Sequence, residues 1–489
     1  MSQEPPTMQQ PRPLTTWNQA ALRGYVRQVH CFETDGGPAV LDALGNKLEA
    51  ALEDVCLRMP HMAGKLSLSK EKPGIILLHT SEDDRVTCRT CDVRGHENLA
   101  YSKLKEQGFP AGAFIGPVFD TNATLSEDGP PIPVTQFLLN LVDGGILMSI
   151  FVHHSVTDGV GVNQFLTAVA AAMKDSAKFR REPLCYPSKI DIPVPSGPED
   201  NGHDAELAKA LIKQCPDLTL AETATAHSSY LSSVYRVSQV KFGGIFVFGP
   251  DKMRLLKEAV VSAGYPRMPS TFACLAALSW AFMTTTRLKT VGIADESREA
   301  DVRCRLYVPT WWGTRLFKEQ LSGYAGNEVV FIEASSGAED LFTISEATPA
   351  NFSHAKGALM RVVQSIETTL GSVDEAYVKT RATLFNNVRD PRQVQYSFMP
   401  ADPRQLFFNS WRRLGADIEW TIPTATGSKL TVADAVRKSQ SAWNESAGLI
   451  MPGRQDQHDY ETVLSSDVES MAALRDNAAW KSWVDREIF

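Results

Sequence analysis

The stretch from Pro133 to Gly159 constrains the fold of this chain more than any other part of the sequence. Two strand-like runs, Val134–Leu141 and Ile146–Val152, flank the turn signal Asp143-Gly144-Gly145 and predict a β-hairpin. The second run is apolar on both faces, so we expect it in the middle of a sheet. The hairpin therefore predicts a sheet with this strand at its centre.

This hairpin leads directly into the run His153-His154-Ser155-Val156-Thr157-Asp158-Gly159. Beyond the run, Phe165, Leu166, Val169 and Met173 recur at helical spacing. The run is therefore predicted to lie in a strand-to-helix turn. A side chain there can face a cavity while both neighbouring elements hold the backbone.

The chain has 489 residues, too many for one ordinary core, which predicts two domains. We expect a first domain over 1–185, a proline-rich and then polar crossover over 186–240, and a second domain over 241–489. Both halves alternate helices and strands, and the expected helices include Leu41–Val55, Ser270–Arg287 and Val432–Ala447. The prediction is two α/β domains, each a mixed sheet flanked by helices.

Charge and hydropathy exclude two classes of partner. The formal net charge of −8 argues against general nucleic-acid binding, which needs a basic face. The longest apolar runs are shorter than the roughly 18–20 residues that span a bilayer, and the N-terminus has no signal-peptide pattern. We therefore expect a cytoplasmic protein without a membrane or nucleic-acid partner.

The motifs of metal and serine chemistry are missing from the sequence. His153 and His154 are adjacent, and no third histidine or carboxylate follows at ligand spacing. Cys88 and Cys91 have no second ligand pair, so we expect reduced structural thiols and no metal. A Gly-x-Ser-x-Gly nucleophile turn is also missing, which disfavours a serine hydrolase.

His154 is the residue best suited to proton transfer. Imidazole titrates near neutrality, so it can take a proton from an alcohol or an amine. Asp158 could orient this imidazole, or turn away and pair with a basic residue, and Gly159 permits a backbone geometry closed to other residues. Two histidines at a strand end that bond only to backbone carbonyls would be the structural alternative.

Five segments in order give the chain a resemblance to the BAHD acyltransferases, particularly their fungal secondary-metabolite branch, the trichothecene O-acetyltransferase-like proteins. These segments are Leu48–Leu66, Gln136–Gly159, Ser270–Arg287, Asp301–Leu306 and Gly326-Asn327. The resemblance covers nearly the whole chain. It implies two chloramphenicol-acetyltransferase-like domains with the active-site channel between them, and a segment near 417–440 that packs with the first domain.

The resemblance also implies a mechanism. Acyl-CoA, with acetyl as the default acyl group, is the co-substrate, and His154 is the general base in a ternary complex with a small hydroxylated acceptor, less readily an amine. Asn409 would donate to the oxyanion, beside Trp411. Asp158 would be structural and would pair with Arg303, or else with Arg305, while His153 would be a packing residue.

The second family signature is degenerate in this chain, because Asp417-Ile418-Glu419-Trp420-Thr421-Ile422-Pro423 keeps the Asp, Trp and Pro but loses both glycines. Two alternatives stay open. A stand-alone enzyme similar to condensation domains would take its acyl group from a carrier protein, and a non-catalytic homologue would only bind a ligand. The family default is a monomer, and no phosphate-binding loop identifies the CoA contacts.

Overall fold

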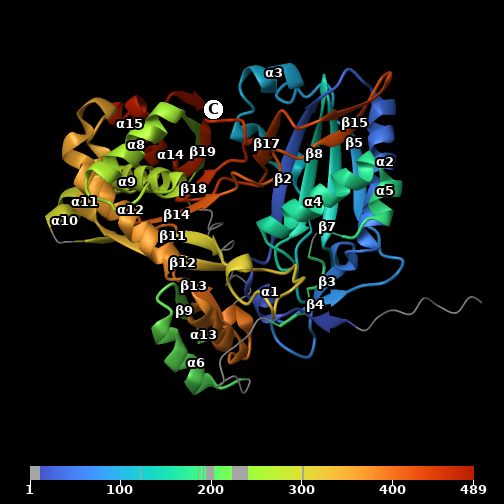
Figure 1. Cartoon of the computed structure of the whole chain (residues 1–489), viewed down its shortest axis with the longest axis horizontal. Helices are drawn as coiled ribbons and strands as arrows, with labels where there is room; N and C mark the ends of the chain where they lie inside the picture. The colour runs from blue at the N-terminus through green and yellow to red at the C-terminus, as the bar shows by residue number, and fades with distance from the viewer. Residues whose placement is uncertain are drawn as a thin grey trace, which may run out of the picture.

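The computed structural model describes residues 11–121, 123–184, 187–190, 192–193, 203–222, 240–299 and 302–489. Two lobes lie side by side, one built mainly from the N-terminal half of the chain and the other mainly from the C-terminal half (Figure 1). Each lobe holds a mixed sheet flanked by helices, so the predicted fold class is confirmed.

The first lobe is built on a five-stranded sheet. Its strands run in the order β17 (Ala435–Lys438), β2 (Tyr25–Glu33), β8 (Gly145–His153), β7 (Thr135–Val142) and β5 (Thr87–Asp92). The predicted hairpin is β7–β8, closed at Gly144, whose φ of 81° favours glycine. All nine residues of β8 are buried, which confirms the prediction of a central strand.

Helices cover this sheet. On one face α2 (Pro38–Cys56) packs against α4 (Gly159–Lys174), which α5 (Ser176–Arg181) follows. The predicted helix over Leu41–Val55 is α2. A short 3-10 helix follows it at Pro60–Met62. The other face is covered by α3 (Tyr101–Glu106) and the loops that follow it.

The second lobe is built on a seven-stranded sheet. Its strands run in the order β12 (Val329–Gly337), β11 (Arg303–Trp311), β14 (Gln405–Ser410), β18 (Ala447–Ile450), β19 (Tyr460–Asp467), β10 (Lys241–Phe248) and β20 (Arg486–Ile488). The core lies around α9 (Thr271–Thr290), and Ser270 is the N-cap of this helix, where its hydroxyl accepts a hydrogen bond from the Ala273 N–H. The other helices of this lobe are α8 (Pro250–Ser262), α10 (Ala294–Glu299), α11 (Ala338–Ser345), α12 (Lys356–Gly371), α14 (Val468–Asp476) and α15 (Ala478–Trp483).

Smaller elements complete the two lobes. A four-stranded sheet, β1 (Arg12–Pro13), β4 (Ile76–His79), β3 (Lys65–Leu68) and β6 (Ile132–Pro133), lies below the first lobe in Figure 1. A separate small cluster packs around a pair of strands, β9 (Leu218–Leu220) and β13 (Val394–Tyr396). Its helices are α1 (Thr16–Ala20), α6 (Ala205–Leu211) and α13 (Glu375–Asn386). Much of the predicted crossover over 186–240, like Asp301, lies outside the described residues.

The helix predicted over Val432–Ala447 is wrong. The chain forms β17 there, which pairs antiparallel with β2 of the first lobe, and later enters β18. Ala435 and Val436 pack into different clusters on the two faces of the sheet, a period-two pattern over too few residues to be distinguished from a helix. The hydrogen-bonded pairing with β2 is what makes residues 435–438 a strand.

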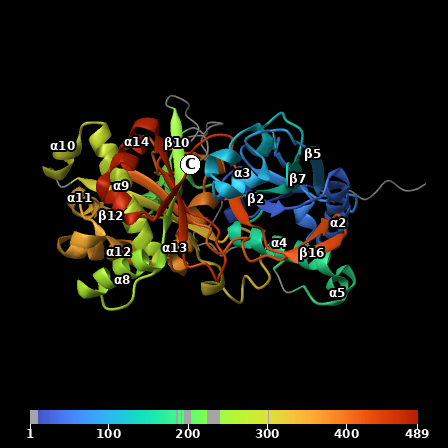
Figure 2. The ribbon, with the colours of Figure 1, turned by 90° about the horizontal axis from the view of Figure 1, so that it is seen from above.

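The segment before β17 also lies on the first lobe. The hairpin β15 (Trp420–Thr424) and β16 (Gly427–Thr431) lies beside α2 and α4 (Figures 1 and 2). Trp420 is fully buried with its ring 5.6 Å from that of His30, whereas Asp417 is exposed and accepts from the Gln455 N–H at 3.1 Å. The degenerate signature therefore belongs to a packing segment.

Candidate active site

The histidine run occupies the turn between β8 and α4, as predicted from the sequence. His153 is the last residue of β8 and is buried, with its ring 5.1 Å from that of Tyr25. His154 is partly buried, and its backbone N–H donates to Gly24 O at 2.7 Å. This backbone bond ties the histidine to the start of β2.

Four hydrogen bonds determine which nitrogen of His154 carries the proton. The Asn327 backbone N–H lies 2.8 Å from one atom of the Asn18 side-chain amide. Because this N–H can only donate, the Asn18 atom that it contacts must be the oxygen. The Asn327 Nδ2 group donates to that same oxygen and to His154 O, which leaves Asn327 Oδ1 at 3.0 Å from His154 Nδ1. An amide oxygen only accepts, so Nδ1 is protonated and Nε2 is the basic nitrogen.

The surroundings of His154 keep its imidazole neutral. Burial lowers the pKa of His154 below its ordinary value, while the charge of Asp158 and the bond to Asn327 oppose this shift. Burial lowers the pKa of His153 to about 3. At neutral pH both rings are therefore uncharged, and His154 has the protonation state that a general base requires.

The predicted pairing of Asp158 with Arg303 or Arg305 is wrong. Asp158 is the N-cap of α4 and accepts from the N–H groups of Val160 and Gly161, while its second oxygen accepts from Glu328 N–H at 3.0 Å. Three backbone donors and the helix N-terminus supply the compensation that an arginine would have given. The two arginines lie on β11, where Arg303 bonds to Ser335 and Arg305 faces Glu333.

Gly159 does not have the left-handed backbone that the sequence suggested. It is the first residue of α4, and it is absent from the positive-φ glycines of the described chain. A Cβ atom at Gly159 would lie 2.9 Å from the tip of Leu414, so close approach of the second half explains the glycine. Gly161 similarly leaves room for Thr157, whose hydroxyl donates to Ala325 O at 2.8 Å.

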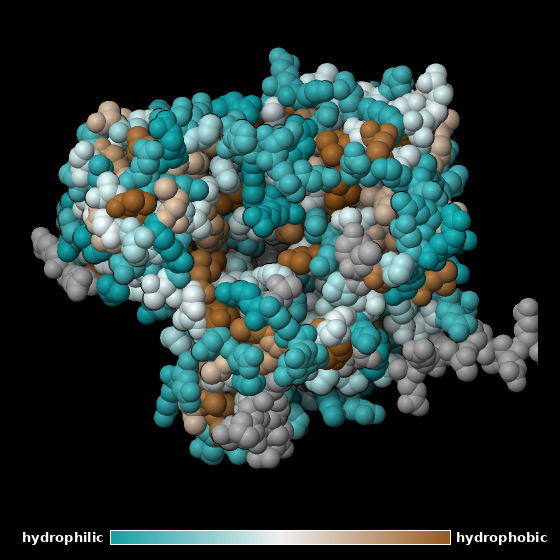
Figure 3. Space-filling view, viewed as in Figure 1, coloured by the Kyte–Doolittle hydropathy of each residue, from teal (hydrophilic) through white to brown (hydrophobic). Residues whose placement is uncertain are grey.

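A cavity of about 1880 Å³ lies between the two lobes. His153, His154, Asp158 and Gly159 line it from the first lobe. The space-filling view is hollowed near its centre, with apolar side chains at the rim (Figure 3). The histidine turn therefore faces a space large enough for a drug-sized ligand and more.

The end of β14 faces the same cavity with the predicted residues Asn409 and Trp411. The Asn409 side-chain oxygen accepts from the Ser410 N–H at 2.7 Å. This bond identifies the oxygen, so the NH2 group is the free end of the amide, with no partner among the described residues. Trp411 is partly buried, and its backbone N–H donates to Ile450 O.

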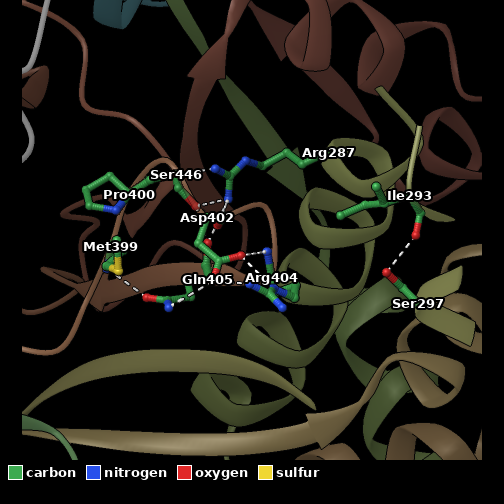
Figure 4. Close-up of polar contacts among 9 residues, drawn as sticks. All are labelled: Arg287, Ile293, Ser297, Met399, Pro400, Asp402, Arg404, Gln405 and Ser446. Atoms are coloured by element: carbon green, nitrogen blue, oxygen red, sulfur yellow. Dashed lines mark hydrogen bonds and ion pairs between the residues drawn. The ribbon is translucent and has the colours of Figure 1, made fainter. Parts of the chain in front are cut away.

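Arg287, in the last turn of α9, holds the two strands that flank this part of the cavity (Figure 4). Its guanidinium donates to Pro400 O, Asp402 O and Gln405 O, and to the hydroxyl of Ser446. Gln405 begins β14 and Ser446 precedes β18. One buried side chain thus organises the start of the strand that carries Asn409.

The predictions about metals and membranes rest on absence in the sequence. Among the described residues, no three His, Cys, Asp or Glu side chains lie close enough together to hold a metal ion. Within the same ranges, every helix is too short or too polar to cross a bilayer. Cys88 and Cys91 lie on β5 as free thiols.

Asn18 and Asn327 are the site residues that sequence reasoning missed. Asn327 stood in a matching Gly-Asn turn, but nothing in the sequence indicated its contact with His154. Asn18 lies 309 positions away in α1, and no local pattern identifies it. Only the approach of the two lobes brings these amides together.

Comparison with known proteins identifies relatives of the first lobe. Residues 25–173 match the model of the trichothecene 3-O-acetyltransferase-like N-terminal domain. The chain is 24% identical to trichothecene 8-O-acetyltransferase of Fusarium sporotrichioides, over 50% of this chain and 52% of that protein. It therefore spans about half the length of that relative. It is 21% identical to the O-acetyltransferase ptmV of Penicillium ochrochloron, over 97% of both chains.

Solved structures show that the fold extends over the whole chain. F. graminearum TRI101 complexed with coenzyme A and T-2 mycotoxin superposes with a TM-score of 0.73 at 17% identity, covering 98% of this chain and 100% of that chain. Vinorine synthase superposes with a TM-score of 0.60 at 14% identity, covering 99% and 96%. The arrangement of the two lobes is thus a known one.

Proposed function

We propose that this chain, which belongs to the fungal BAHD-type acyltransferases by its N-terminal domain and its two-lobed fold, transfers an acyl group from acyl-CoA to a hydroxyl group of a small molecule. Acetyl is the acyl group we expect, since the relatives include trichothecene and ptmV O-acetyltransferases. The observation that carries the proposal is the orientation of His154, with a basic Nε2 in a cavity between both lobes.

His154 acts as the general base in the proposed reaction. Its Nε2 takes the hydroxyl proton as the acceptor oxygen attacks the thioester carbonyl, and the Asn327 oxygen stabilises the imidazolium through Nδ1–H. A base held in this way contributes about 10²–10⁴-fold in rate. The bond formed is the new C–O bond, and the carbonyl becomes a tetrahedral oxyanion.

Asn409 is the proposed donor to that oxyanion. Its NH2 group is free toward the cavity, and such a donor is worth roughly 3–4 kcal/mol in other enzymes. Collapse of the intermediate breaks the C–S bond, and the proton on His154 passes to the departing sulfur. The products are the ester and free CoA, and His154 returns to its neutral form.

The first test is thiol release from acetyl-CoA and other acyl-CoAs, with pooled hydroxylated fungal metabolites as acceptors. We expect acceptor-dependent release by the wild type that falls at least 100-fold in His154→Ala. His354→Ala is the matched control, because His354 is exposed and bonds only to the local Asn351 carbonyl. Folded wild type that releases no thiol from any acyl-CoA would refute the proposal and favour a carrier-protein donor or a binding role.

A further inference from the structure

The cations that line the cavity differ in whether the protein gives them a hydrogen-bond or ion-pair partner. Arg27 lies 3.2 Å from Asp120, and Arg23 donates to Gly74 O at 2.7 Å. Arg287 is satisfied by three carbonyls and a hydroxyl. The ammonium of Lys438 has neither an ion pair nor a hydrogen bond with any residue that the structure describes. Lys438 is therefore the unpartnered cation of this part of the cavity wall.

Lys438 has a defined position relative to His154. It is the last residue of β17 and lies opposite Gln28 of β2, while His154 is bonded to Gly24 at the start of β2. Four residues of strand separate these two points, or about 13 Å at roughly 3.3 Å per residue. A long side chain at this point can reach a distal group of a molecule whose reacting atom lies at His154.

The surroundings of Lys438 carry an excess of positive charge. Burial and the nearby Arg27 lower the pKa of Lys438 to about 8, so the ammonium is still the main form at pH 7. Asp120 is ion-paired with Arg27, and no described carboxylate forms an ion pair with Lys438. Lys438 is partly buried. A partly buried cation without a counter-charge is costly, and a bound anion would reduce that cost.

We propose that Lys438 binds an anionic oxygen group of a substrate, a phosphate or a carboxylate, at the end of the cavity formed by β17 and the start of β2. This inference rests on the proposed function for the identity of the substrates. The phosphate would belong to the CoA moiety, and the carboxylate to the acceptor. The chemistry at Lys438 is the same in both cases, namely an ammonium N–H bond to a charged oxygen.

The test compares wild type with Lys438→Met, Lys438→Arg and Lys70→Met, an exposed lysine outside the cavity lining. Isothermal titration uses CoA and pantetheine, which lacks phosphate, and thermal shift uses inorganic phosphate and succinate. A phosphate site predicts at least tenfold weaker CoA binding in Lys438→Met, partial recovery in Lys438→Arg and unchanged pantetheine binding. A carboxylate site predicts unchanged CoA binding and loss of the succinate-induced rise in Tm.

Lys438→Met should fold with an unchanged or higher Tm without ligand, because it removes an unpartnered, partly buried charge. If the CoA affinity and the anion-induced Tm shifts of Lys438→Met equal those of wild type, the Lys438 site is refuted, whether or not thiol release is seen. A third outcome separates the two proposals. If the wild type neither binds CoA nor releases thiol, but anions raise its Tm and do not raise that of Lys438→Met, the proposed function is refuted and the anion site is retained.

Discussion

The tautomer of His154 is determined by residues that belong to three separate parts of the chain. The Asn18 side-chain oxygen accepts hydrogen bonds from the Asn327 backbone N–H and Nδ2 group, which orients the Asn327 amide. The Asn327 oxygen then accepts a hydrogen bond from the His154 Nδ1–H. Asn327 is a positioning residue, since it acts through His154. Loss of its amide would free the imidazole to flip or to change tautomer.

Asn327→Asp tests this role through the pH profile of acyl transfer. His154 must be neutral to act, so activity is present above its pKa and is lost as the pH falls through it. Burial lowers that pKa in the wild type, which extends activity to lower pH. A carboxylate at position 327 favours the imidazolium, so we expect the acid limb of kcat/KM to move to higher pH by about 1 unit.

Asn327→Ala is the companion variant, and we expect kcat to fall roughly 10²-fold with little change in the KM for acyl-CoA. Asn351→Ala is the control, since Asn351 is an exposed residue whose side chain bonds only to Thr348. An acid limb that stays in place in Asn327→Asp would show that Asn327 does not act through His154.

At the scale of elements, the cavity wall depends on strands that are held from behind. The loop before β14 and the residue before β18 both bond to Arg287 at the end of α9, as Figure 4 shows. Burial lowers the pKa of Arg287 from its ordinary value, although the group remains protonated at neutral pH. Its four acceptors are divided between two guanidinium nitrogens, an arrangement that suits a planar guanidinium and not a single ammonium.

Arg287→Ala is expected to lower the free energy of unfolding by about 3–5 kcal/mol, because buried carbonyls lose their donor. Arg287→Lys should recover only part of this loss, since one nitrogen cannot reach acceptors on both sides of the fork. Urea unfolding gives the comparison, with the exposed Arg254→Ala leaving the midpoint unchanged. Full recovery in Arg287→Lys would contradict the geometric explanation.

At the scale of the molecule, the second half of the chain supplies parts of the first lobe. The strand β17 and the hairpin β15–β16 come from the second half of the chain and pack on the first lobe. Residues 325–328 of the same half also dock on the histidine turn, through bonds to Thr157, Asp158 and His154. The first lobe is therefore incomplete without residues from the second half of the chain.

We therefore expect the whole chain to unfold in one cooperative transition. Leu48→Ala, in the core of the first lobe, should cost about 2–5 kcal/mol and lower hydrogen-exchange protection in α9 of the second lobe equally. Leu57→Ala is the control, because Leu57 is 81% exposed. Two calorimetric transitions, with Leu48→Ala shifting one of them alone, would show that the lobes are independent.

Much of the architecture follows from local patterns. The central strand β8, the helices α2, α4 and α9, and the turn that holds His154 were all predicted from hydrophobic periodicity and turn residues. These patterns succeed because side chains repeat every two or 3.6 residues over runs long enough to be read. The placement of His154 and Asn409 on one cavity came from a family resemblance, which carries information that a single sequence does not.

By itself, then, the sequence determined the sheet that ends at His154, the helix that follows and the chemical type of the base. The tertiary structure alone decided that Asp158 caps α4 in place of an arginine pair, that residues 435–438 form a strand, and that Asn18 and Asn327 orient His154. Apart from the local cap bonds of Asp158 to Val160 and Gly161, these features depend on groups at least 170 positions apart. Local periodicity records which face of an element is buried, but it does not record which distant group will lie against that face.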